Sequence, residues 1–187
     1  MGGITMKDKK TLYIVQTAVM LALLIAVQFF THAFSTFITG SLVNLILLVS
    51  VLIIGYGGGL IIALVSPFCA FFMGVGPAFI QIVPFVAVGN AIFISIAWLF
   101  RKFITAPDMK KKRAAIIGLV LAGLVKMLFL WIGLVTFMLP MIPGLNAAKQ
   151  SIIGAAFTWP QIITALIGSA LALLIVPLIR RALKTGA

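Results

Sequence analysis

Six apolar runs, separated by short breaks that hold nearly all of the charged residues, constrain this chain more than any other feature. A helix that crosses the roughly 30 Å hydrocarbon core of a bilayer needs about 20 apolar residues. The runs that meet or approach this length cover residues 12–31, 41–55, 60–74, 78–100, 114–139 and 159–182. We therefore predict an all-α integral membrane protein, a single domain over residues 1–187 with six transmembrane helices.

Two breaks in this pattern need an interpretation. Three consecutive glycines, Gly57 to Gly59, follow the second run. Each glycine costs about 1 kcal/mol in a helix interior, which favours a tight turn over one long helix. Residues 151–157 are apolar but too few to span a bilayer, so they are predicted to form a short interfacial or re-entrant segment before the sixth helix.

The basic residues predict the orientation. They gather in the tail 1–11, the loop 101–113 and the C-terminal segment 180–184. With six spans, all three clusters lie on one side, and only Lys149 lies in a loop on the other. Because cytoplasmic loops carry an excess of Lys and Arg, we predict that both termini are cytoplasmic. The outer loops are then residues 32–40, 74–78 and 140–158.

Composition excludes several classes of function. The net charge is +12, but 64% of the residues are hydrophobic and 9% are charged. The chain therefore lacks the water-facing basic surface of a nucleic-acid-binding protein, and membrane lipid is the expected surrounding. No Asp or Glu lies in a predicted span, one His and one Cys cannot form a metal site, and no P-loop occurs. We expect neither an enzyme nor a bound cofactor, which leaves the binding or passage of a small molecule.

Lys126, near the middle of the fifth run, is the most informative residue. A lysine at the centre of a membrane helix costs roughly 2.5–3.5 kcal/mol on insertion scales, and no nearby acid neutralises it. It is either held by backbone carbonyls, Asn90 or water in an inner cavity, or it is the counter-charge for an anionic solute. Asn90 in the fourth run likewise either packs between helices or contacts the solute.

Other polar and aromatic residues gather toward the predicted outer side. They are typical of a pocket wall for a small flat ligand, although tryptophans also form the interfacial belt of membrane proteins. The candidates are Gln81, Trp131, Asn146, Lys149, Trp159 and Gln161. Residues of the first outer loop are candidates to close over the pocket, namely Phe29, Phe30, His32 and Phe34.

Ala18, Ala22 and Ala26 place small side chains on one face of the first span. A spacing of four residues allows a second helix to approach closely. The neighbouring helix belongs either to this chain or to a partner protein.

Taken together, these features resemble a known family. The run Thr39 to Asn44, the turn Gly55 to Gly59 and the stretch Pro84 to Ala91 are similar to segments of the substrate-binding S components of energy-coupling factor (ECF) transporters. The resemblance covers Thr11 to Lys184. It implies a protein of the bacterial plasma membrane that captures a vitamin-like solute outside. It also implies a transmembrane coupling subunit, which would contact the alanine face, and two cytoplasmic ATPases.

Two other classes of function remain as alternatives. One is a stand-alone facilitator or channel, and the other is a membrane assembly protein that binds no solute. A channel needs a continuous polar path, whereas the polar residues here cluster in the outer half of the predicted spans. A pocket with no exit toward the other side favours a carrier whose movement another protein must drive.

Overall fold

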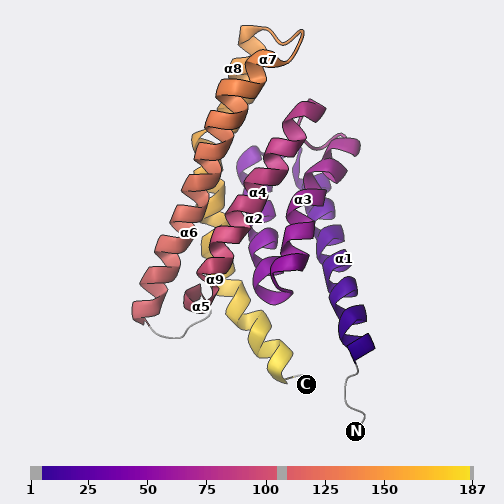
Figure 1. Ribbon diagram of the computed structural model, residues 1–187, viewed down its shortest axis with the longest axis vertical. Coiled ribbons are helices and arrows are strands. Elements are labelled where there is room, and N and C mark those ends of the chain that lie inside the picture. Colours follow the sequence, from indigo (N-terminus) through magenta and orange to yellow (C-terminus); the bar gives the residue numbers. More distant parts are fainter. Residues whose placement is uncertain (1–5, 105–108, 186–187) are drawn as a thin grey trace.

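The computed structural model describes residues 6–104 and 109–185, which form helices joined by short connections, with no strand among them (Figure 1). The longer helices are α1 (Met6–Thr31), α2 (Thr36–Ile53), α3 (Tyr56–Phe72), α4 (Val83–Leu99), α6 (Met109–Phe129) and α9 (Trp159–Thr185). The shorter elements are η1 (Ile80–Ile82), α5 (Arg101–Ile104), η2 (Leu130–Met138), α7 (Leu139–Met141) and α8 (Ala147–Ala156). The predicted all-helical class is confirmed.

Five helical stretches are long and apolar enough to cross a membrane: 8–31, 36–53, 80–99, 111–141 and 147–183. Helix α3 is apolar too but has only 17 residues. The prediction that Gly57 to Gly59 form the turn before this helix is wrong, because they lie in its first turn and the break falls at Ile54 and Gly55, where Gly55 has a φ of 117°. The structure thus supports a multi-pass membrane protein, and the sixth crossing stays a prediction. Helix α2 begins at Thr36, five residues before the predicted apolar run, because the Ser35 side chain accepts a hydrogen bond from the Phe37 backbone N–H at 3.0 Å and caps the helix there.

The start of α1, the end of α9 and the α5–α6 region lie at the same end of the bundle (Figure 1). We call this the basic end, because it carries Lys9, Lys10, Arg101, Lys102, Lys111, Lys112, Arg113, Arg180 and Arg181. Lys149 lies in α8, at the opposite end. Arg180 also ties α9 to the last turn of α2, since its Nη2 donates to the Leu52 carbonyl oxygen at 2.7 Å.

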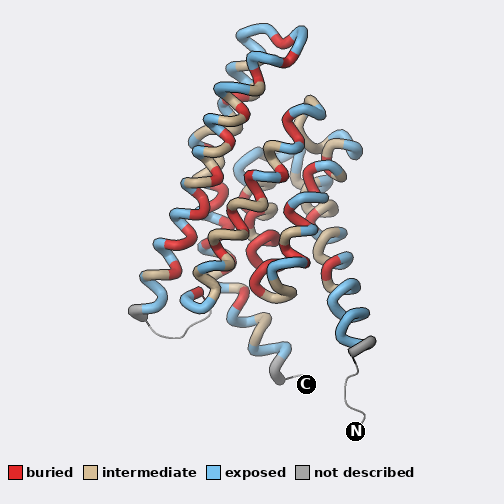
Figure 2. Tube along the Cα trace, viewed as in Figure 1, coloured by how far each residue is buried: buried red, intermediate tan, exposed pale blue. Residues whose placement is uncertain are grey.

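Helix α2 is the centre of the packing. Every residue from Ile46 to Leu52 is buried, as expected of a helix that has neighbours on all sides. Helices α1, α3, α4 and α9 surround it. Figure 2 shows that buried positions concentrate on the inward faces of the helices, while much of α1 is exposed.

The stretch predicted to precede the sixth helix without spanning the membrane forms α8, a separate ten-residue helix. Asn146 caps it, because the Asn146 Oδ1 atom accepts from the Lys149 backbone N–H at 2.9 Å. Figure 1 shows α7 and α8 extending beyond the other helices at the end opposite the basic end. The position of α8 relative to the membrane stays a prediction.

Gly168 allows α9 to approach α2 closely, and this contact is testable. A Cβ atom at position 168 would lie 2.7 Å from the Ser41 carbonyl oxygen and 2.8 Å from the Leu45 backbone nitrogen. Because backbone atoms cannot move aside cheaply, we expect Gly168→Ala to destabilise the protein by about 1–3 kcal/mol, measured as a lower melting temperature in detergent. The matched control is Gly133→Ala, whose Cβ would meet a Phe85 side-chain atom at 3.3 Å. Equal melting temperatures for the two variants would contradict the tight α2–α9 contact.

Candidate functional site

Three helices meet at the ammonium group of Lys126. The side chain is buried, with 3% of its surface exposed. Its Nζ atom donates to Asn44 Oδ1 of α2 at 2.8 Å and to Asn90 Oδ1 of α4 at 2.9 Å. The Phe93 ring lies 5.4 Å from the same atom, within the range of a weak cation–π contact. Lys126 therefore joins α2, α4 and α6 in the middle of the bundle.

The Asn44 amide has a fixed orientation. Thr164 donates its only hydroxyl proton to the Gln161 carbonyl oxygen at 3.1 Å, so Thr164 Oγ1 must accept the bond from Asn44 Nδ2 at 3.3 Å. An ammonium group can only donate, so Asn44 Oδ1 must face Lys126. Both ends of the amide are thus assigned, and Asn44 links Lys126 to α9.

A cavity of about 270 Å³ lies against this network. Its polar lining residues are Gln28, His32, Thr36, Thr39, Asn44, Asn90, Lys126 and Gln161, and its larger apolar ones are Val43, Pro67, Val75, Pro77, Val86 and Phe157. Residues 32–40 and 75–77 belong to or adjoin the connections at the end opposite the basic end. The cavity therefore extends from the Lys126 network toward that end. Its volume lies just below the roughly 300–1,000 Å³ of pockets for drug-sized ligands, which suits a small solute.

The charge of this cavity is uncompensated. Among the residues that the structure describes, no carboxylate lines it and Lys126 forms no ion pair. The Asn90 contact matches the structural interpretation of Lys126, and the adjoining cavity is the space that the counter-charge interpretation requires. The two interpretations thus describe one arrangement, in which two amides hold a cation beside an open volume.

The structure brings together three of the residues predicted from sequence to bind a solute: Lys126, Asn90 and Gln161. The others lie away from this cavity: Gln81, Trp131, Asn146, Lys149 and Trp159. Trp131 follows Lys126 by five residues, a rotation of about 140° around an ideal helix, and its side chain is 49% exposed. Trp159 is 59% exposed and contacts Phe37, with 5.8 Å between the ring centroids.

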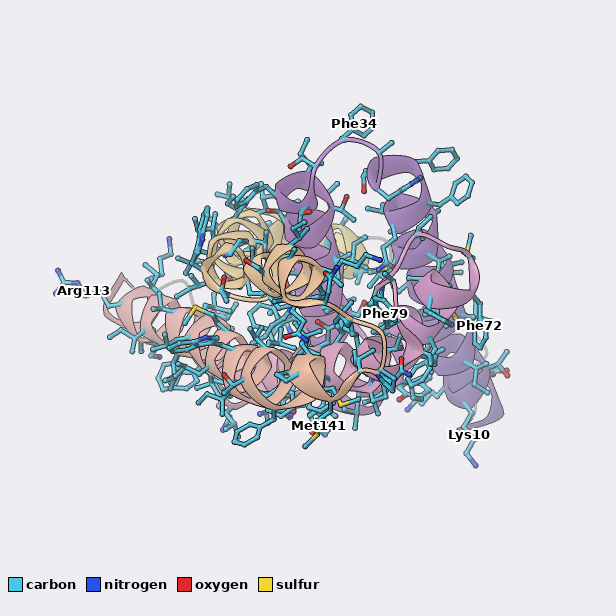
Figure 3. All side chains as sticks on the ribbon, turned by 90° about the horizontal axis from the view of Figure 1, so that it is seen from above. Lys10, Phe34, Phe72, Phe79, Arg113 and Met141 are labelled. Atoms are coloured by element: carbon cyan, nitrogen blue, oxygen red, sulfur yellow. The ribbon has the colours of Figure 1, made fainter. Side chains whose placement is uncertain are left out.

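The four aromatic residues predicted to lie at the first outer loop occupy different environments. His32 lines the cavity, and its Nδ1 donates to the Phe29 carbonyl oxygen at 2.7 Å. Phe29, Phe30 and Phe34 are exposed instead. Figure 3 shows Phe34 pointing away from the bundle. His32 is thus the one of these four residues that the structure places at the cavity.

Sequence reasoning overlooked Asn44. The signal was present, because an asparagine in an almost wholly aliphatic run has to find a partner inside the membrane. It also did not assign Gln28, Thr36 and Thr39 to the site. Thr36 and Thr39 fall in the predicted loop 32–40, and Gln28 lies near the end of the first predicted span.

Ala18 and Ala22 are exposed on α1, and Ala26 is partly buried. The flanking Val15, Val19 and Leu23 are exposed as well. Within the part of the chain that the structure describes, this alanine face is thus open at Ala18 and Ala22 and partly covered at Ala26. The exposure favours a partner outside this chain over internal packing.

One comparison with known proteins found a match. Residues 12–180 match the model of a family described as "ECF transporter, substrate-specific component". No curated protein and no solved structure matches the chain. The match covers all the residues that line the cavity and the whole alanine face of α1.

Proposed function

Because the chain belongs to the substrate-specific components of ECF transporters, we propose that it captures a small solute in the cavity beside Lys126. A separate energising module then drives uptake of this solute. One observation carries the proposal: a buried lysine that lines a small cavity and forms no ion pair with a described residue. A charged lysine buried in a membrane protein costs free energy. An anionic solute that accepts a hydrogen bond from Lys126 and balances its charge would offset that cost.

The energising module, in this proposal, consists of a transmembrane coupling subunit and two ATPases. The sequence has no P-loop, so ATP hydrolysis by that route is assigned to the partners. The alanine face of α1 is the proposed contact with the coupling subunit, because its small exposed side chains allow close helix approach.

We propose that the basic end faces the cytoplasm of a bacterial cell and that the cavity receives solute from outside. The excess of Lys and Arg at the basic end supports this orientation. The cavity is lined by connections at the opposite end, which is where a captured solute would enter.

Cysteine labelling tests the orientation. In a Cys69→Ala background, a membrane-impermeant thiol reagent should label Phe34→Cys and Ala147→Cys in intact cells. It should label Lys111→Cys only after permeabilisation, because that residue lies at the basic end. Labelling of Lys111→Cys in intact cells would overturn both the orientation and the proposed entry side.

Purification and reconstitution test the function. We expect native mass spectrometry of the purified protein to detect a bound small molecule. We also expect proteoliposomes to accumulate it only when the coupling subunit, the ATPases and ATP are present. Uptake by the chain alone would instead show a stand-alone facilitator. Absence of both a bound molecule and saturable binding would show a membrane protein without a solute.

A further inference from the structure

We propose that the solute is a monocarboxylate whose carboxylate group accepts hydrogen bonds from Lys126 Nζ and Asn90 Nδ2 at the inner end of the cavity. This inference rests on the proposed function, because it names the chemical class of the solute for that same site. It follows from the unused donors at the site and from the charge of the site.

The first unused donor belongs to Lys126. An ammonium group has three N–H donors. Two of them are used by Asn44 Oδ1 and Asn90 Oδ1. The third has no acceptor among residues 6–104 and 109–185, and Lys126 lines the cavity. A solute that enters the cavity meets this donor.

The other unused donors belong to Asn90. Its oxygen must face Lys126, because the ammonium group can only donate. The Asn90 Nδ2 group is therefore turned away from Lys126, and it donates to no residue that the structure describes. Asn90 is 3% exposed and lines the same cavity. The amide oxygens of Asn44 and Asn90 accept from Lys126, so the donors left beside Lys126 are its third N–H and the Asn90 Nδ2 group. The lining also holds an acceptor without a partner, Gln28 Oε1.

The charge of the site selects among ligands that accept hydrogen bonds. Lys126 supplies one positive charge, and His32 is the only other titratable side chain in the described lining. A carboxylate brings one negative charge and balances the lysine. A phosphate monoester carries about −1.5 to −2 charges at pH 7, which leaves excess charge in a site of low polarity. An ammonium compound meets the like charge of Lys126, and a neutral amide leaves the charge of the lysine unbalanced.

Asn44 acts as a positioning residue for this site. Its amide is fixed between Thr164 and Lys126, so it holds the ammonium group at the end of the cavity. With Asn44 and Asn90 both accepting from Lys126, the remaining N–H is the one available to a solute.

Four compounds with one ring and different head groups test the assignment: benzoate, benzamide, phenyl phosphate and benzylammonium. Their dissociation constants would be measured by titration calorimetry on the detergent-purified protein at pH 7. We expect benzoate to bind at least tenfold more tightly than each of the others. Tighter binding of phenyl phosphate or benzylammonium, or no preference for benzoate, would overturn the proposal.

The variant Asn90→Asp gives a second, sharper test. It replaces the donor Nδ2 with a carboxylate oxygen and supplies Lys126 with its own counter-ion, so benzoate should bind at least tenfold more weakly. The melting temperature should be retained, because the buried lysine gains a partner. The matched control is Asn146→Asp, which lies outside the cavity and caps α8 equally well as an aspartate. Unchanged benzoate binding in Asn90→Asp would exclude Asn90 from the carboxylate site.

The outcomes separate this inference from the proposed function. A co-purified solute that lacks a carboxylate but is taken up only with the energising module would refute the inference and leave the function standing. Selective benzoate binding without module-dependent uptake of any co-purified solute would refute the proposed function and leave the inference about the carboxylate standing. If Asn90→Asp fails to fold, Lys126→Met must abolish the preference for benzoate over benzamide, and a preference that persists overturns the assignment.

Discussion

Lys126→Met is expected to lose solute binding while the protein remains at least as stable as the wild type. The methionine fills a similar volume without the ammonium group, so an anionic solute would enter a cavity that has no buried counter-charge. Leaving one partner of a buried charge pair unpaired typically costs 3–5 kcal/mol. Such a cost weakens binding by at least a hundredfold.

The stability of this variant follows from the same geometry. Removing the lysine relieves the roughly 2.5–3.5 kcal/mol that a central lysine costs on insertion scales. It also frees the Asn44 and Asn90 oxygens, which line a cavity with room for water. We therefore expect the melting temperature in detergent to stay the same or rise.

The measurement needs both quantities on one preparation, the melting temperature and the affinity for the co-purified solute. Lys149→Met is the matched control, because it removes the same charge from an exposed residue outside the cavity. It should leave both quantities unchanged. Full affinity in Lys126→Met would assign the lysine a purely structural role and move the anion site to Lys149.

The apolar runs predicted the helices because the membrane imposes one requirement on every span, a length of hydrocarbon-compatible helix. The count of apolar residues missed the start of α2 at Thr36, because residues 36–40 mix polar and apolar side chains and the Ser35 cap sets where the helix begins. A helix start that depends on a cap, rather than on hydropathy, is invisible to a count of apolar residues.

The site was predicted in part for a similar reason. Lys126 and Asn90 stood out because each is anomalous in its own span, and the structure brings them to 2.9 Å. Asn44 was equally anomalous, but only the fold shows that its amide on α2 faces Lys126 on α6. Contacts between residues 82 positions apart follow from packing and not from any local pattern.

Trp131, in η2 just after α6, shows that closeness in sequence to Lys126 does not place a side chain at the same cavity. Sequence distance placed it near Lys126, but rotation around the helix turns it outward. The stretch that begins at Leu130 is moreover a π-helix, in which Thr136 Oγ1 contacts the Trp131 carbonyl oxygen at 3.2 Å, five residues back. A change from α to π register alters which face each following residue occupies, and no hydropathy pattern in this apolar stretch reports it.

Ala22→Trp, and separately Ala18→Trp, is expected to reduce recovery of the coupling subunit with the tagged chain at least tenfold, while solute binding stays intact. Both alanines are exposed on α1, so added bulk should leave the fold of the isolated protein unchanged. Against a partner helix, the indole would hold the two backbones apart and remove the close contact that small residues permit. The cavity residues nearest in sequence are Gln28 of α1 and His32, just after α1, both more than a turn beyond Ala22, which is why affinity for the solute should persist. Ala170→Trp is the matched control, an exposed alanine within α9, and it should co-purify the coupling subunit at the wild-type yield. Equal yields for Ala22→Trp and Ala170→Trp would show that the coupling subunit contacts the chain elsewhere, because an interface built on small residues cannot accept a side chain of that size without separating.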